Sequence, residues 1–438
     1  MKTNLEDISP VKKKLMIEIE AKEVDNRLDK AYKEYGKRAK IRGFRPGKIP
    51  RKILENYFAQ QVMEEVTREI VSETLPRAVE ETKTLPVSMP VVENGPLKVN
   101  QNFKYSAVIE VRPEFELKDD MGLQVQKEIC SLGDEAVDKH LEEIRKTHGK
   151  LINIDEDRTV KEDDYVIMEY EGFEGEKALE GIKSHNFLLR TGSNDFHPDF
   201  EKALIGLHRG DETEIKVDFN DSYYHSKLAG KSVNFRVKVI EIKVMELPDL
   251  NDDFAKNLGT DFDNLEGLKI KIREDLIARE EKRIDKELKE RILKKISDGV
   301  SFELPDSLVE SEIRYAIESI RQNLIRAGSS MEKAGLREEK LREEFRPAAE
   351  NRVKNMLILG EIAKKNNLNI DESELSDAFT AMAKSIGQDS GVLRKYYETN
   401  NLVDSYKEKL LEEKTLNYLV KSANIFKVTA DVIHGEGK

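Results

Sequence analysis

The spacing of apolar residues changes character along this chain, and that change constrains the fold more than any other feature. Residues 12–20 alternate apolar and polar side chains, the period of a half-buried strand. Residues 155–245 carry short alternating runs that glycines interrupt, and after Pro248 the apolar residues follow helical spacing. A chain of 438 residues also exceeds the usual span of one hydrophobic core. The sequence therefore predicts a multidomain α+β protein.

The segments have different expected architectures. Residues 1–112 are predicted to form an α+β domain with antiparallel strands, in which the apolar positions from Ile53 to Val79 indicate two helices. Residues 113–150 are predicted to be a polar connector with one short helix. Residues 151–245 are predicted to form a small β-sheet domain with a short helix, and residues 246–438 an elongated all-α domain.

Composition excludes several classes of protein. Charged residues make up 37% of the chain and hydrophobic ones 38%, and no run of about 18 apolar residues occurs, so no membrane association is expected. Cys130 is the one cysteine, which excludes an intrachain disulfide and a cysteine-rich metal site. The first residues show no secretory signal pattern, so the expected location is the cytoplasm.

Motifs for cofactor chemistry are missing. Gly230-Lys231-Ser232 resembles the end of a phosphate-binding loop, but His225 stands where its first glycine is required. The seven histidines are scattered, and His140 and His148 lack the spacing of helical metal ligands. We therefore expect no cofactor and no metal.

One short segment is strongly basic in an acidic chain of net charge −12. Residues 37–52 contain eight basic side chains among sixteen and no acidic one. Two glycines and two prolines predict an irregular loop, with Phe44 at its tip. The segment is either a solvated loop whose Phe44 folds back onto its domain, or a binding site for RNA or an acidic protein.

The loop carries a recognisable motif. Gly43-Phe44-Arg45-Pro46-Gly47-Lys48-Ile49-Pro50 resembles the ribosome-binding signature of the bacterial trigger factor family. The resemblance implies docking at the exit tunnel of the large ribosomal subunit, on ribosomal protein and rRNA. The residues implied in docking are Gly43, Phe44, Arg45, Pro46 and Lys48. The family often has lysine where this chain has Pro46, so one charge contact is missing.

The aromatic-rich segment resembles an FKBP-type prolyl isomerase. Met168-Glu169-Tyr170-Glu171-Gly172 and Phe196-His197-Pro198-Asp199-Phe200 match two segments of that family's proline-binding pocket. For most of these aromatic residues, ordinary core packing is the alternative reading. The resemblance implies a prolyl-binding pocket formed by Tyr170, Phe187, Phe196, His197, Phe200, Tyr224 and Phe235, together with Leu179 and Glu180.

Two departures from the FKBP pattern leave the efficiency of the isomerase open. Leu179-Glu180 stands where the family has a Phe-Asp pair, and His197 replaces an isoleucine whose backbone amide binds substrate. The missing catalytic triad is no obstacle, because rotation of an X–Pro bond needs no nucleophile. An apolar site that favours the twisted amide lowers the barrier of ~20 kcal/mol.

Taken over the whole chain, the trigger factor resemblance implies an ATP-independent chaperone that binds nascent and unfolded polypeptides. The 113–150 connector then packs with the helical C-terminal domain, and the protein forms a homodimer away from the ribosome. Two other functions stay open at this point. A free-standing prolyl isomerase would show activity without ribosome binding, and an RNA-binding protein would bind naked RNA with steep salt dependence.

Overall fold

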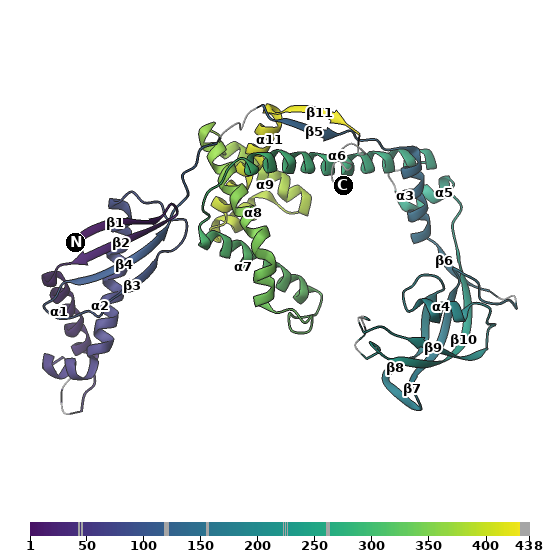
Figure 1. The fold of residues 1–438 in the computed structure, drawn as a ribbon, viewed down its shortest axis with the longest axis horizontal. Coiled ribbons are helices and arrows are strands. Elements are labelled where there is room, and N and C mark those ends of the chain that lie inside the picture. Colours follow the sequence, from purple (N-terminus) through teal and green to yellow (C-terminus); the bar gives the residue numbers. More distant parts are fainter. Residues whose placement is uncertain are drawn as a thin grey trace. The chain divides into compact units, whose positions relative to one another are not determined.

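The computed structural model describes residues 1–42, 44, 47–117, 122–154, 157–221, 223, 225, 227–259 and 263–429 (Figure 1). The chain divides into two compact units. The first joins Met1–Ile129 to Ile284–Lys438, and the second is Cys130–Arg283. Within the described ranges, every helix is too short or too polar to cross a membrane.

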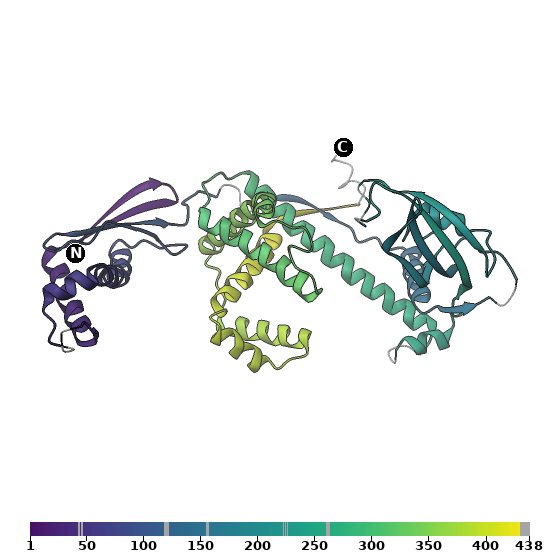
Figure 2. The ribbon, with the colours of Figure 1, turned by 90° about the horizontal axis from the view of Figure 1, so that it is seen from below.

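The first unit begins with a four-stranded antiparallel sheet in the order β1-β2-β4-β3. Its apolar residues recur at every second position and lie on one face, where both following helices pack, as Figure 2 shows. The bounds of these elements are β1 Lys2–Ser9, β2 Lys12–Ile19, α1 Ala21–Arg38, α2 Arg51–Glu81, β3 Val91–Asn94 and β4 Phe103–Glu110.

The prediction of two helices between Ile53 and Val79 is wrong, because α2 runs unbroken through this region. No glycine or proline interrupts residues 51–75, so nothing in the sequence breaks the helix there. Pro76 lies inside the last turns of α2 and removes one backbone donor without ending the helix. The side chains buried along α2 are Leu54, Val62, Val66, Ile70, Thr74 and Ala78.

Most of the rest of the first unit is helical. Its helices bury apolar stripes against one another, and α9 starts with a complete capping box formed by Asp371 and Glu374. These helices are α7 Asp306–Arg326, α8 Glu338–Lys365, α9 Glu372–Ile386, α10 Ser390–Thr399 and α11 Val403–Ser422, with the second half of α6 Leu265–Asp298.

A small parallel sheet that the sequence analysis did not predict joins the connector to the end of the chain. Strand β5 (Gln124–Glu128) pairs with β11 (Asn424–Val428) in register, with Val125 opposite Ile425. Each strand has only five residues, which is too few to show a clear alternation.

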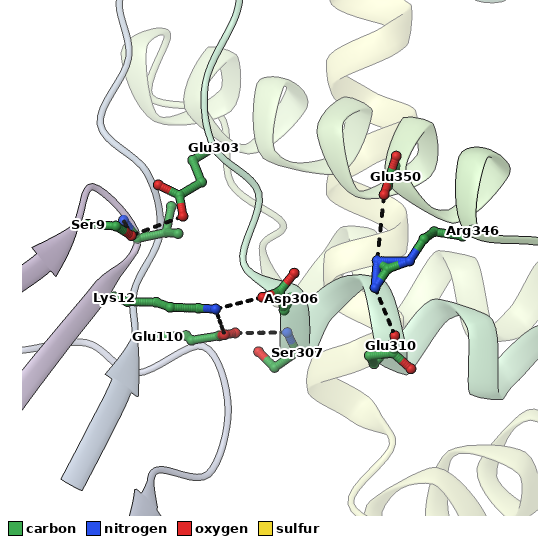
Figure 3. A network of polar contacts seen from close by, with 10 residues as sticks. Ser9, Lys12, Glu110, Glu303, Asp306, Ser307, Glu310, Arg346 and Glu350 are labelled. Carbon is green, nitrogen blue, oxygen red and sulfur yellow. Dashed lines mark hydrogen bonds and ion pairs between the residues drawn. The ribbon is translucent and has the colours of Figure 1, made fainter. Parts of the chain in front are cut away.

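The sheet domain and the helices of the first unit meet at a polar cluster that we call the clasp, formed by Ser9, Lys12, Glu110, Glu303, Asp306 and Ser307 (Figure 3). Next to it in the sequence, Phe115 of the connector stacks on Phe302, with ring centroids 4.1 Å apart. The clasp therefore holds the sheet, and the stacked pair holds the connector, against the segment that leads into α7.

The second unit carries a five-stranded antiparallel sheet around its own core. Strand β10 is central, since it pairs with β6, β7 and β9, while β8 pairs with β7. The elements are α3 Asp134–Thr147, β6 Lys150–Asn153, β7 Tyr165–Glu174, β8 Lys177–Arg190, α4 Pro198–Leu204, β9 Glu212–Asp218, β10 Ser232–Glu246 and α5 Asp252–Leu258, with the first half of α6.

Candidate functional site

The basic segment forms the end of α1, a loop over residues 39–50 that we call the docking loop, and the start of α2. Two backbone features shape it. Gly47 adopts φ +80°, a left-handed conformation that favours glycine, and its amide donates to the carbonyl of Gly36 at 2.8 Å. The amide of Phe44 donates to the carbonyl of Ile41 at 3.1 Å, so the loop turns back toward α1 before α2 starts.

Of the predicted docking residues, Phe44 and Lys48 lie in described positions. The Phe44 residue is 38% exposed, so its ring is not buried in the sheet domain. Lys48 is exposed and makes no ion pair with any described residue. Gly43, Arg45 and Pro46 lie outside the described residues.

Arg51 differs from the other cations of the segment because internal contacts use its guanidinium. It forms an ion pair with Asp29 of α1, and its Nε lies 2.7 Å from the Glu55 carboxylate. The same group lies over the Tyr32 ring, 5.1 Å from the centroid. Arg51 thus links α1 to α2 at the base of the docking loop.

The second candidate site is an aromatic cluster in the β-sheet domain. Phe200 of α4 and Phe235 of β10 are fully buried, with ring centroids 5.3 Å apart. Tyr170, Phe187 and Phe196 are partly exposed and pack on them, with Phe196 4.7 Å from Phe200. These five predicted residues therefore meet at one place, where the buried rings form the base and the partly exposed rings form the rim.

Leu179 and Glu180, which stand where the FKBP pattern has a Phe-Asp pair, differ in their surroundings. Leu179 packs partly buried against the core of this domain. Glu180 is exposed, and its carbonyl accepts a hydrogen bond from Lys227 Nζ at 2.9 Å. Tyr224 lies outside the described residues.

His197 is positioned at the entrance to α4. It is the N-cap, and its Nδ1 accepts the Asp199 amide at 3.3 Å. Its ring contacts Phe219 edge-on, with 5.2 Å between centroids. The His197 side chain is thus engaged by the Asp199 amide and the Phe219 ring. Neither contact uses the backbone amide of His197.

Two residues that the sequence analysis missed hold the segment just before α4. The Glu201 carboxylate accepts the amides of Asn194 and Phe196, at 2.9 and 3.1 Å. The Tyr223 hydroxyl donates to the Phe196 carbonyl at 2.7 Å. The sequence carries one signal for Glu201. It is an acidic residue between Phe200 and Leu204, which are buried in the short helix α4, and a buried acidic residue needs hydrogen-bond partners.

A partly buried ion pair supports the same domain. Asp164 is 4% exposed and receives two hydrogen bonds from Arg158, at 2.6 and 2.9 Å, and one from the Lys161 amide. Burial raises the pKa of Asp164, but the hydrogen bonds from Arg158 and Lys161 outweigh it, so the pKa lies below its ordinary value.

The chemistry of the aromatic cluster is that of an apolar binding surface. Among the described residues, no group of three or more histidine, cysteine, aspartate or glutamate side chains is placed to hold a metal. Apolar rings around a proline exclude water and favour an amide that has lost its resonance, which lowers the barrier to rotation.

Profiles of known families match nearly the whole chain. The family described as "Bacterial trigger factor protein (TF)" matches residues 1–144, and its C-terminal counterpart matches residues 264–421. The family described as "FKBP-type peptidyl-prolyl cis-trans isomerase" matches residues 156–240.

Curated relatives match over nearly their full length. A trigger factor from Geotalea daltonii is 37% identical over 98% of this chain and 98% of its own. A trigger factor from Geotalea uraniireducens is 35% identical over 98% and 99% of the two chains. A solved structure from a study of "Promiscuous Substrate Recognition in Folding and Assembly Activities of the Trigger Factor Chaperone" covers 96% of this chain and 99% of its own, with a TM-score of 0.50 at 21% identity, and shares the fold.

Proposed function

The chain belongs to the bacterial trigger factor family, and on that premise we propose that its docking loop binds the ribosome and its aromatic cluster binds prolyl peptides. The protein is a ribosome-associated chaperone for nascent polypeptides, with an FKBP-type peptidyl-prolyl isomerase domain. The observation that carries this conclusion is that the two trigger factor profiles and the FKBP-type profile all match this one chain, which is 37% identical to a trigger factor over 98% of its length.

The proposed docking surface consists of Gly43, Phe44, Arg45, Pro46 and Lys48, in contact with protein and rRNA at the exit tunnel. Exposure of Phe44 supports an aromatic anchor, since an aromatic side chain beside basic residues is typical of binding sites. The positive charge of Lys48, unopposed among the described residues, supports a contact with phosphate.

Co-sedimentation with bacterial ribosomes tests the docking surface. The wild-type chain should sediment with 70S particles, and Phe44→Ala with Arg45→Ala should remain in the supernatant while circular dichroism stays unchanged. Equal sedimentation of both proteins would refute the assignment. Isomerase activity without any sedimentation would favour a free-standing isomerase.

The proposed prolyl site comprises Tyr170, Phe187, Phe196, His197, Phe200, Tyr224 and Phe235, bordered by Leu179 and Glu180. The rim of partly exposed rings around the buried Phe200 and Phe235 supports a small apolar ligand. In this site the rings bind the proline ring and exclude water. The backbone amide of His197 holds a substrate carbonyl, which fixes one side of the prolyl bond while the other side rotates about it.

The helical part of the first unit is proposed to bind unfolded chains. Large apolar side chains stand exposed on its helices, which supports adaptable contact with unfolded segments. The most exposed of them are Tyr315, Ile325, Ile386, Val392 and Tyr396. Suppression of aggregation of an unfolded client by the full chain tests this role.

Three further features remain proposals. Homodimerisation away from the ribosome would be measured by sedimentation velocity across protein concentration. A cytoplasmic location follows from the ribosome as partner. The domain limits 1–112, 113–150, 151–245 and 246–438 would be tested by limited proteolysis, which should cut near them first.

A further inference from the structure

A groove of about 990 Å³ lies along α2 in the N-terminal sheet domain, and we call it the edge groove. One wall is α2 between Gln60 and Ser72, and the other is β3 with the turn that follows it. Its volume is at the upper end of the range for small-molecule sites, so a segment of polypeptide fits it. The apolar side chains of its lining are Met63, Val71, Val92, Pro96 and Leu97.

Strand β3, which forms one wall of the edge groove, is an edge strand. The order β1-β2-β4-β3 leaves its outer side without a neighbouring strand among the described residues (Figure 1). Apart from those of β4, no described residue forms a hydrogen bond with its backbone. The amides and carbonyls on that side are therefore available to an extended chain that lies along β3.

A second hollow, of about 640 Å³, lies over the opposite face of the same sheet. It shares Asn94 and Gly95 with the edge groove, and its lining is more polar, with Lys14, Glu18 and Glu93. Successive side chains of a strand point to opposite faces of a sheet. A segment paired with β3 would therefore place every second side chain on the apolar side and the others on the polar side.

The dimensions of the edge groove limit the length of this segment. A helix rises about 1.5 Å per residue, so the stretch from Gln60 to Ser72 is about 18 Å long. An extended chain spans that length with about five or six residues. Pro90 and Pro96 flank β3 and have no amide to donate, so pairing cannot continue far beyond the strand.

The position of the edge groove on α2 indicates which polypeptide occupies it. Helix α2 begins at Arg51, directly after the docking loop, and the groove begins at Gln60, about 14 Å further along the helix axis. A nascent chain that emerges where the docking loop binds would meet the edge groove within the first turns of α2.

We propose that the edge groove binds extended segments of nascent chains in which apolar and polar residues alternate, by adding them to the sheet beside β3. The inference rests on the proposed ribosome docking, and it names the class of segment that the sheet domain binds. Alternation is the pattern of a half-buried strand, so such a segment is one that would otherwise pair with other exposed strands.

Fluorescence anisotropy with the full-length chain tests the alternation and the pairing. The probe is a fluorescein-labelled hexapeptide in which valine alternates with threonine. One control peptide has three valines followed by three threonines, and the other keeps the alternation but carries N-methyl groups on all its amides. The probe should bind about tenfold more tightly than either control, because strand addition needs both the backbone donors and the alternating faces.

The protein variants place the same side chain inside and outside the edge groove. Thr67 lines the groove and is partly exposed, so Thr67→Arg should fill it and weaken binding of the probe about tenfold. Gln61→Arg is the matched control, because Gln61 is exposed on the same helix and is not part of the lining, and it should bind as wild type does. If Thr67→Arg has a lower melting temperature than wild type, Ser72→Arg replaces it, since Ser72 is exposed at the other end of the groove.

Hydrogen exchange locates the bound probe. Exchange of the fragment that contains Val91–Asn94 should slow when the probe is added to wild type and should stay unchanged in Thr67→Arg. Unchanged exchange in wild type, or equal binding of the probe and both control peptides, would overturn the inference even if the chain sediments with ribosomes. If the chain does not sediment with ribosomes but the probe protects β3, the proposed docking fails and the edge groove remains a peptide-binding site.

Discussion

The carboxylate of Glu110, the last residue of β4, accepts a hydrogen bond from the backbone amide of Ser307 at 2.8 Å. Ser307 is the second residue of α7, and Pro305 at the N-cap has no side-chain acceptor to offer. A residue nearly 200 positions earlier in the chain therefore caps this helix.

The other members of the clasp reinforce this contact. Lys12 Nζ lies 2.6 Å from the Asp306 carboxylate and 3.7 Å from that of Glu110, and Ser9 donates to Glu303 at 3.0 Å (Figure 3). The Lys12 and Asp306 side chains are partly exposed, so water and salt weaken their ion pair. The Glu110 side chain is only 13% exposed, which makes its bond to Ser307 the central contact of the clasp.

Glu110→Ala should loosen the first turn of α7. Loss of a helix cap costs about 1 kcal/mol, so the Ser307 amide and its neighbours should exchange roughly fivefold faster with deuterium. Lys13→Ala is the control, because Lys13 pairs with Asp7 inside the β1–β2 hairpin. Unchanged protection at Ser307 in Glu110→Ala would show that water replaces the carboxylate without loss.

Sequence patterns predicted the fold correctly where the spacing of apolar residues within one segment determines whether that segment forms a strand or a helix. Strand β2 and the helices after Pro248 follow their periods closely, and the short helix predicted within residues 151–245 is α4. The patterns failed where partners are distant: β5 forms a strand because β11 completes it, and five residues show too few alternations to be recognised.

The same distinction applies to the sites. The aromatic residues were predictable because a motif groups them and the sheet of β7, β8 and β10 brings them together. Glu201 and Tyr223 were not, because their importance depends on which backbone amide or carbonyl they reach. Arg51 is one of the eight basic residues of segment 37–52, and its pairing with Asp29 is revealed only by the contact between α1 and α2.

Lys48→Ala should change the salt dependence of ribosome binding. If Lys48 neutralises one phosphate, the slope of log affinity against log salt should fall by about 0.7 to 0.9. Arg51→Ala should lower affinity with an unchanged slope, because Asp29 and Glu55 already engage its charge. Binding measured from low to moderate salt separates the two. Equal slopes for Lys48→Ala and wild type would place Lys48 away from rRNA.

Asp164→Asn should destabilise the FKBP-type domain and flatten its response to acid. The pKa of Asp164 lies below its ordinary value of 3.8, because Arg158 and Lys161 hold the charged form despite burial. Its stabilisation is therefore complete above that value and is lost as the pH falls through the lower pKa of the folded state. Near neutral pH the substitution should cost about 2 kcal/mol, less than for a fully buried pair because Arg158 is partly exposed.

Calorimetry between about pH 2.5 and 7 measures this linkage. Asp163→Asn is the matched control. The Asp163 side chain is next to Asp164 in the sequence but is 77% exposed, and its carboxylate lies 3.5 Å from Arg190 Nε. The wild type and Asp163→Asn should lose stability together in acid, and Asp164→Asn should lose less. Parallel curves for all three proteins would mean that Asp164 ionises no more readily in the folded chain than in the unfolded one.

Gly172→Ala should disturb the base of the aromatic cluster. A methyl group at this β7 position would lie 2.7 Å from Ile182 Cγ2 and 3.2 Å from the Phe235 ring, both of which are buried. Overpacking of this kind costs about 1–3 kcal/mol, and displacement of Phe235 should also lower isomerase activity. Gly133→Ala is the control, since no atom lies within 4 Å of the added methyl, and its melting temperature should stay near that of wild type. A wild-type melting temperature for Gly172→Ala would contradict this prediction. It would mean that the Ile182 side chain moves aside without cost and that Phe235 keeps its position.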